Sequence, residues 1–225
     1  MHQPDPSQTD DLTRLLNRGA LLEKLPHALY RAKAENQEEP LSLALIDIDH
    51  FKSINDQYGH VTGDNMLVRA AEVLRSDAGE QALVGRYGGD EFLALFPGEE
   101  REAVFLKLEQ IRQELGQQQV QAENGETING IFISVGVASF PLDGRTENEL
   151  LRKADHALYR AKASGRNQIR LAFEEKMVPK TTHYTPIQLE RLSKLAEERG
   201  VSEADLLREA MDDFLTKYGV NDIET

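Results

Sequence analysis

Two segments of the chain present aspartate residues that could do chemistry on a phosphate. The first is a run of apolar residues that ends at Asp47, and the second presents Asp90 directly after Gly88-Gly89. Two carboxylates that converge at one edge of a sheet form a site for Mg²⁺, which prefers hard oxygen ligands. Metal ions held there would lower the pKa of an attacking hydroxyl and neutralise a reacting phosphate. The pattern therefore predicts a metal-dependent site that acts on phosphates.

Either aspartate alone is better interpreted as a turn or strand-end residue that binds nothing. The glycine pair changes this interpretation, because Gly88 and Gly89 leave no side chain at the turn. A nucleotide can then approach the backbone closely. Asp47, Asp90 and the two glycines together favour a nucleotide site over a purely structural role.

Hydrophobic periodicity predicts the elements that position these residues. A Gly-Gly pair between two apolar runs predicts a tight hairpin. Pro26 should kink or split the first helix. We expect strands over 41–47, 81–87, 91–96 and 127–138, and helices over 10–36, 63–76, 101–116 and 146–164. This order predicts an α/β fold in which a mostly antiparallel sheet is flanked by helices.

Composition limits the site and its partners. The 225 residues include no cysteine, so a metal must use carboxylate, carbonyl or histidine ligands. The net charge of -13 argues against general attraction to nucleic acid or to an anionic membrane. Neither a signal peptide nor a run of about 20 apolar residues is visible, so we expect a cytoplasmic protein with no membrane partner.

The character of the chain changes after Phe173. We expect an N-terminal tail over 1–9, a catalytic domain over 10–173, a linker over 174–180 and a small module over 181–220. That module should contain a short extended piece and two amphipathic helices broken at Gly200, with Ser202 and Asp205 at the start of the second. Such a module has too little core to be stable alone, so we expect a dimer. The residues predicted to point inward are Leu189, Leu192, Leu195 and Ala196, then Leu207, Ala210, Met211 and Phe214.

Over residues 10–170 the sequence resembles the GGDEF family of diguanylate cyclases. The name-giving motif is unaltered at residues 88–92. Other landmarks follow in the family's order: Asp10-Asp11-Leu12-Thr13, Asn17-Arg18, 47–56, Gly59-His60, Gly63-Asp64, 134–138, Ala154-Asp155, Ala161-Lys162 and Gly165-Arg166-Asn167. The resemblance implies the nucleotidyl-cyclase, ferredoxin-like GGDEF fold. It also implies the condensation of two GTP molecules into cyclic di-GMP and two pyrophosphates by a homodimer, in which each domain binds one GTP.

Site roles are likewise implied by the resemblance. Asp47, the Ile48 carbonyl and Asp90 would bind Mg²⁺ or Mn²⁺. Asp90 and Glu91 are the catalytic candidates for activating the ribose 3′-hydroxyl, and which one takes the proton stays open. The implied substrate-binding residues are Asn55 and Asp64 at the guanine edge, His60 in the guanine pocket, Lys52, Lys162 and Arg166 at the triphosphate, and Gly88 and Gly89 at the turn.

Several of these residues have structural interpretations as well. His60 is also suited to capping or packing at a helix start, and Lys162 and Arg166 lie where a helix dipole favours cations. We interpret Asp49 and Asp56 as structural. Asp10 and Arg86 are expected to form a pair that ties the N-terminal segment to the hairpin.

The sequence departs from the family pattern at two places. Many members carry an inhibitory Arg-x-x-Asp site for the product, which begins nine residues before the first motif glycine. Gly79 and Ala82 occupy those positions here, so we expect no feedback inhibition through that site. Arg14 stands where glycine is usual, and we attach no functional meaning to it.

The C-terminal pattern that begins at Tyr184-Thr185-Pro186 resembles a ribbon-helix-helix module. In that family two chains pair their strands into a ribbon that reads DNA. Residues 174–225 hold 12 acidic and 7 basic side chains, which favours dimerisation over DNA binding. Two alternatives to the enzyme remain: a non-catalytic sensor of GTP or cyclic di-GMP, and a DNA-binding regulator.

Overall fold

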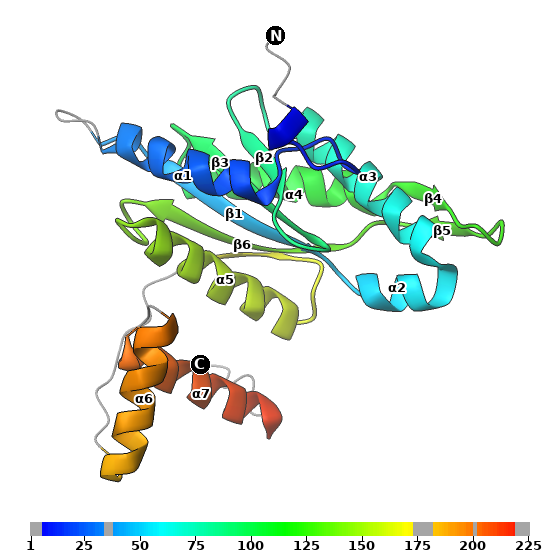
Figure 1. Cartoon of the computed structure of the whole chain (residues 1–225). Coiled ribbons are helices and arrows are strands. Elements are labelled where there is room, and N and C mark those ends of the chain that lie inside the picture. Colours follow the sequence, from blue (N-terminus) through cyan, green and yellow to red (C-terminus); the bar gives the residue numbers. More distant parts are fainter. Residues whose placement is uncertain (1–5, 34–37, 173–181, 200–201, 219–225) are drawn as a thin grey trace. The chain divides into compact units, whose positions relative to one another are not determined.

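The computed structural model describes residues 6–33, 38–172, 182–199 and 202–218. The chain divides into two compact units, Met1–Glu174 and Glu175–Thr225, and each is described by itself (Figure 1). The predicted linker over 174–180 lies outside the described residues. Near the N-terminus, the 3-10 helix η1 (Pro6–Gln8) precedes an isolated bridge between Thr9 and Leu16.

A five-stranded sheet with the order β2-β3-β1-β6-β7 forms the centre of the first unit. Strand β1 (Leu41–Ile48) pairs antiparallel with β3 (Glu91–Pro97) and with β6 (Ile133–Phe140). Strand β2 (Leu83–Arg86) is antiparallel to β3, and β7 (Ile169–Leu171) is parallel to β6. The predicted α/β fold with a mostly antiparallel sheet is confirmed.

Helices cover both faces of this sheet (Figure 1). Helices α1 (Arg18–Ala32) and α5 (Glu147–Ala163) pack with Leu43 and Leu45 of β1, whereas α3 (His60–Asp77) and α4 (Arg101–Gly116) pack with Ala44 and Ile46. Successive side chains of a strand point to opposite faces. Asp47 therefore shares the face of Leu43 and Leu45, on which α5 lies.

The first helix differs from its prediction over 10–36. It begins at Arg18, because the Asn17 side chain accepts a hydrogen bond from the Ala20 N–H at 2.9 Å and caps the helix. The helix is not split at Pro26, which lies inside α1. Leu25 and Leu29 are each 1% exposed, and their burial on either side of Pro26 offsets the backbone hydrogen bond that proline removes.

Three further differences concern short elements. The strand predicted over 127–138 is two strands: β5 (Thr127–Asn129), which forms a separate hairpin with β4 (Gln119–Gln121), and β6. Gly130 separates them with a left-handed φ of 85°. Helix α2 (Phe51–Tyr58) was not predicted, because it has only eight residues and none of them is buried, although Phe51 and Ile54 are partly buried against the core. Strand β7 has only three residues, too few for a pattern.

The second unit consists of α6 (Pro186–Arg199) and α7 (Glu203–Lys217), so the predicted break near Gly200 is confirmed. Thr185 and Gln188 form a capping box at the start of α6: the Gln188 N–H donates to Thr185 Oγ1, and the Thr185 N–H donates to Gln188 Oε1. Residues 182–185 form no strand within this chain. The predicted role of Asp205 as a cap concerns a side chain outside those described.

Most predicted inward residues of the second unit are not buried in the single chain. Ala196 is buried, but Leu189, Leu195, Met211 and Phe214 are 38–57% exposed. Ala210 is also exposed, whereas Leu192 and Leu207 are partly buried. Two helices without a further layer cannot enclose their apolar faces, so the inward prediction, made for a module that dimerises, stays a prediction for the exposed residues. Among the residues that the structure describes, no helix is long and apolar enough to span a membrane.

Candidate active site

Three carboxyl groups meet at the edge of the sheet where β1 ends. In the register of the sheet Asp47 lies opposite Glu91, and side chains directly opposite each other on neighbouring strands lie close together. The Ile48 N–H donates to the Asp90 carbonyl at 3.2 Å, which ties the strand to the residue before Glu91. The structure thus brings Asp47, Ile48, Asp90 and Glu91 together, as predicted.

Asp47 is 7% exposed and pairs with Lys162 of α5, whose Nζ lies 2.7 Å from Asp47 Oδ2. Burial raises the pKa of the Asp47 carboxyl, and repulsion from Asp90 and Glu91 adds to the rise, whereas Lys162 opposes it. The sequence analysis missed this pair, because only the packing of α5 on β1 brings position 162 beside position 47. The edge therefore concentrates negative charge that favours cations.

This donor set fits a divalent metal ion. Two aspartate carboxylates and the Ile48 carbonyl are hard oxygen donors, and the mutual repulsion of the carboxylates would be relieved by a cation. Among the described residues, no three acidic, histidine or cysteine side chains are grouped tightly enough to hold a metal on their own. Phosphate oxygens and water would therefore complete the coordination of an ion here, as is usual for Mg²⁺.

The Gly88-Gly89 turn is closed by hydrogen bonds from the Tyr87 and Gly88 N–H groups to the Glu91 carbonyl, at 2.8 and 3.2 Å. A Cβ on Gly88 would lie 2.6 Å from Glu91 Oε2, which is the end of a flexible side chain and can move aside, so packing alone does not require glycine there. A Cβ on Gly89 would meet nothing within 4 Å. The fold does not explain the glycine at 89, and the open space beside it suits a close-fitting ligand.

Arg86 supports the same turn. Its Nη2 and Nε donate to the Gly89 carbonyl at 2.7 and 3.1 Å. Its Nη1 lies 3.4 Å from Asp10 Oδ1, which confirms the predicted pair between the N-terminal segment and the hairpin. Hydrogen bonds from Thr13 and the charge of Arg86 lower the pKa of Asp10, although burial, the largest single influence, opposes them. The pair holds the motif turn against the start of the domain.

Asn55 provides a buried acceptor beside α3. Its Oδ1 has no hydrogen-bond partner, although it is shielded from solvent. A Cβ on Gly63 would lie 2.0 Å from this oxygen, so Gly63 leaves the room that the amide occupies. Asp64, the next residue, is exposed. A buried polar atom without a partner is costly, and a ligand donor at this position would satisfy it.

The remaining predicted substrate residues are accessible. Lys52 on α2, His60 at the start of α3 and Arg166 after α5 are all exposed, and Lys162 is partly buried against Asp47. No side chain caps the N-terminus of α3. The capping alternative for His60 is therefore wrong, and its exposure speaks against the packing alternative as well. Helix α5 ends at Ala163, so Lys162 lies in its last turn and Arg166 beyond it.

Comparison with known proteins identifies the first unit. The family model described as "Diguanylate cyclase, GGDEF domain" matches residues 7–168. The chain belongs to the GGDEF family. A second model, described as "Ribbon-helix-helix domain", matches residues 177–219 and supports the resemblance of the C-terminal module to that family.

Named relatives agree with the GGDEF assignment. A diguanylate cyclase of Vibrio cholerae is 38% identical over 162 residues, which are 72% of this chain and 49% of that protein. Diguanylate cyclase A of Treponema denticola is 34% identical over 165 residues, covering 73% of this chain and 44% of the relative. This chain thus spans less than half the length of these two relatives.

A solved structure shows the same fold. The GGDEF domain of DgcB from Caulobacter crescentus, determined in complex with c-di-GMP, has a TM-score of 0.69 and 36% identity. The match covers 76% of this chain and 99% of that domain. The GGDEF fold of the first unit is therefore shown by structure as well as by sequence.

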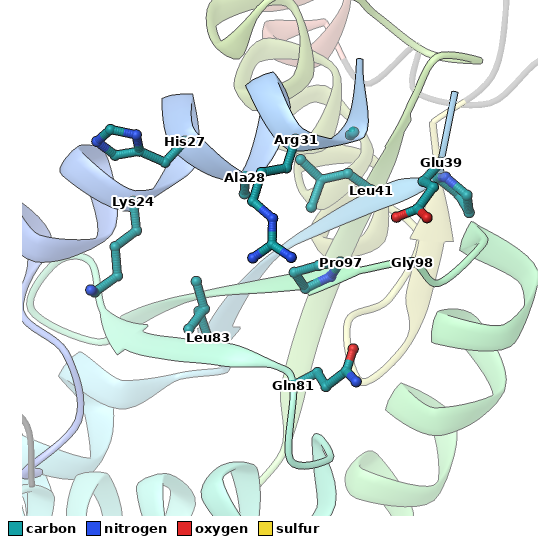
Figure 2. Close-up of a pocket in the computed structure, with 12 residues that line it drawn as sticks. Lys24, His27, Ala28, Arg31, Glu39, Leu41, Gln81, Leu83, Pro97 and Gly98 are labelled. Carbon is teal, nitrogen blue, oxygen red and sulfur yellow. The ribbon is translucent and has the colours of Figure 1, made fainter. Parts of the chain in front are cut away.

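A cavity of about 300 Å³ in the GGDEF domain lies away from this edge, at the other end of the same strands (Figure 2). Leu41 at the start of β1 and Pro97 at the end of β3 line it, together with Lys24 and Arg31 of α1. None of the predicted site residues lines the cavity. The cavity is therefore separate from the candidate active site.

Proposed function

We propose that this GGDEF protein is a diguanylate cyclase that converts two GTP molecules into cyclic di-GMP and two pyrophosphates. The observation that carries the proposal is the convergence of Asp47, Asp90 and Glu91 at one sheet edge, beside a glycine turn that leaves space for a nucleotide. Family membership and the named diguanylate cyclases among its relatives support it. We further propose that the protein acts in the cytoplasm, where GTP is available.

In each half of the reaction a ribose 3′-oxygen forms a bond to the α-phosphorus of the other GTP. The bond from that phosphorus to the bridging oxygen breaks, and pyrophosphate leaves. Asp47, Asp90 and the Ile48 carbonyl would hold Mg²⁺ or Mn²⁺, which would make the 3′-hydroxyl more acidic and neutralise phosphate charge. Asp90 and Glu91 are the candidate acceptors of the hydroxyl proton.

Guanine would be recognised by acceptors on α2 and α3. The unpartnered Asn55 Oδ1 and the Asp64 carboxylate would accept hydrogen bonds from guanine N1–H and N2–H₂. Adenine has no hydrogen on N1 and lacks the 2-amino group, so it would leave these acceptors unsatisfied. His60, at the start of α3, would lie at the edge of the guanine base.

Three cations would bind the triphosphate: Lys52, Lys162 and Arg166. Lys and Arg side chains form charge-assisted hydrogen bonds to phosphate oxygens. Lys162 already lies 2.7 Å from Asp47, so its ammonium group is held at the edge where the phosphates would bind. Gly88 and Gly89 would let the phosphates approach the backbone of the turn.

Two GGDEF domains must face each other for the ring to close, so the active species would be a homodimer. The C-terminal unit is suited to assemble it, because its apolar side chains are exposed in the single chain and a ribbon-helix-helix model matches it. A linked dimerisation module raises the effective concentration of one domain near the other. The 12 acidic and 7 basic side chains of residues 174–225 argue against DNA binding.

The first experiment incubates the purified protein with Mg²⁺ and GTP and identifies the products by chromatography and mass spectrometry. We expect cyclic di-GMP from the parent and none from Asp90→Ala. Asp56→Ala, a change of another acidic residue that is exposed on α2, is the matched control and should retain activity. If the dimeric parent binds GTP but forms no product, the enzyme proposal fails and the sensor interpretation gains support.

Product inhibition is a separate expectation. Gly79 and Ala82 replace the arginine and aspartate of the usual inhibitory site. We expect the initial rate to stay unchanged when cyclic di-GMP is added before GTP. A marked fall in the initial rate would reveal another inhibitory site.

A further inference from the structure

Asp49 lies two residues beyond Asp47 and is only 4% exposed. Its Oδ1 accepts a hydrogen bond from Ser134 Oγ at 2.7 Å, and its Oδ2 accepts one from the Asn167 N–H at 2.9 Å. A single buried carboxylate thus connects β6 with the loop that follows α5. The sequence analysis interpreted Asp49 as structural. It did not predict the contact with Asn167, because the two residues lie 118 positions apart and no pattern links them.

The loop that Asp49 holds has an unusual backbone. Gly165, Arg166 and Asn167 have successive φ angles of 102°, 63° and 46°. The left-handed region favours glycine, and other residues stay there only when their surroundings hold them. Asn167 is held twice: its N–H donates to Asp49, and its Oδ1 accepts from Arg112 Nη1 at 3.1 Å.

Arg166 is the residue whose direction depends on this arrangement. It is exposed, and among the described residues no ion pair orients its side chain. Its own backbone N–H donates to the Ala161 carbonyl at 3.0 Å, and the next residue is fixed by Asp49. The backbone on both sides therefore determines where the guanidinium can reach.

We propose that Asp49 is a positioning residue for GTP binding: through Asn167 it holds the left-handed loop that directs Arg166 toward the triphosphate. This inference rests on the proposed function, in which Arg166 binds the triphosphate. Asp49 touches neither substrate nor metal in this proposal. It acts by holding the arginine before GTP arrives, which reduces the ordering that binding requires.

Asp49→Asn would test the proposal with little change in side-chain volume. A carboxylate accepts a hydrogen bond at each oxygen, whereas an amide has one acceptor and would turn an NH₂ donor toward one of the two existing donors. The amide can keep both contacts only by donating its NH₂ to Ser134 Oγ, since a hydroxyl also accepts. Both charge-assisted hydrogen bonds then become neutral ones, so Asp49→Asn should weaken the hold on Asn167 and loosen the loop. Asp56→Asn, an exposed change of the same kind on α2, is the matched control.

A double-mutant cycle with Arg166→Ala separates positioning from general stability. The measurements are the KM for GTP and kcat of the full chain with Mg²⁺, the affinity for a fluorescent non-hydrolysable GTP analogue, and the melting temperature. We expect Asp49→Asn to weaken GTP binding about tenfold and to change kcat by less than about twofold. In the Arg166→Ala background, Asp49→Asn should have no further effect on GTP affinity.

Equal tenfold effects of Asp49→Asn in both backgrounds would overturn the inference, and so would a lower melting temperature with unchanged GTP affinity. If Asp49→Asn does not fold, Ser134→Ala removes one donor to the same carboxylate and should shift the KM in the same direction by a smaller factor. A folded Ser134→Ala variant with parental KM would then reject the proposal. A parent that binds no GTP would reject the proposed function itself, which is a distinguishable result.

Discussion

The two units of this chain bury their apolar residues to very different extents. In the GGDEF domain both faces of the sheet are covered, and Leu43 and Phe92 have no exposed surface. In the C-terminal unit Ile187, Met211 and Phe214 are 57–62% exposed. The first unit encloses its own core, whereas the second has apolar surface to offer a partner. From this difference we propose that chemistry and assembly are divided between the two units, and five predictions test that division.

The largest effect is expected from Asp47→Asn. If all the chemistry resides in the GGDEF domain, this change should lower cyclase activity at least about a thousandfold, because a proposed metal ligand is lost. The dimer should persist. Chromatography of the products measures the cyclase activity, and light scattering measures whether the protein is still a dimer. Asp56→Asn is the control. Loss of the dimer in Asp47→Asn would show that the two functions are not separate.

The same variant has an expected stability signature. Burial raises the pKa of Asp47 above its ordinary value of 3.8, so the folded protein binds this proton more tightly than the unfolded chain does. The contribution of Asp47 to stability therefore falls as the pH rises from 3.8 through the raised pKa. Asp47→Asn should melt at the same or a higher temperature than the parent above this window. A clear drop in melting temperature would contradict the sign.

The next effect concerns removal of residues 174–225. The isolated GGDEF domain should fold, because its core is complete without the second unit. Its activity at nanomolar protein should fall about a hundredfold, because the two domains lose their linkage, and should recover as protein concentration rises. Initial rates across a dilution series measure this. Equal specific activity of the truncated and full-length proteins at all concentrations would show that the module does not assemble the cyclase.

Substitutions within each unit give smaller effects. Leu108→Ala in α4, where the side chain is fully buried, should cost about 2–5 kcal/mol of unfolding free energy in the GGDEF domain. Phe214→Asp should weaken the dimer and leave unfolding of the GGDEF domain unchanged. Leu106→Asp, at another exposed apolar side chain, is the control that should preserve the dimer. Denaturant unfolding and sedimentation distinguish these outcomes.

The smallest effect is expected at Arg14, whose φ is 57°. Glycine adopts this left-handed conformation without strain. The ion pair that Arg14 forms with Asp11 is long, at 3.9 Å, and exposed, so its loss should cost little. Arg14→Gly should therefore stabilise the GGDEF domain by about 1 kcal/mol or less and leave activity and dimerisation unchanged. The midpoint of denaturant unfolding measures the change in stability. A loss of stability above about 1 kcal/mol would mean that Arg14 has a packing role.

The sheet, the main helices and the motif hairpin were predictable because their signals are local. Apolar periodicity marks β1, β3 and α4, and two adjacent glycines mark the turn at 88–89. Helix α2 gave only a short signal, because its eight residues include just two apolar residues that pack against the core, Phe51 and Ile54, and neither is fully buried. Met211 and Phe214 are exposed in the single chain, and their pattern could not show what covers them: an amphipathic pattern shows that a face is apolar but not which chain covers it.

The sequence by itself determined the family, the α/β fold and the residue types of the site, since these depend on the order of residues along the chain. Only the tertiary structure decided that Lys162 pairs with Asp47, that Asn55 Oδ1 is buried without a partner, and that Asp49 holds Asn167. These contacts join residues far apart in sequence or depend on burial. They arise when helices pack on a sheet, and no periodicity or spacing in the chain records them.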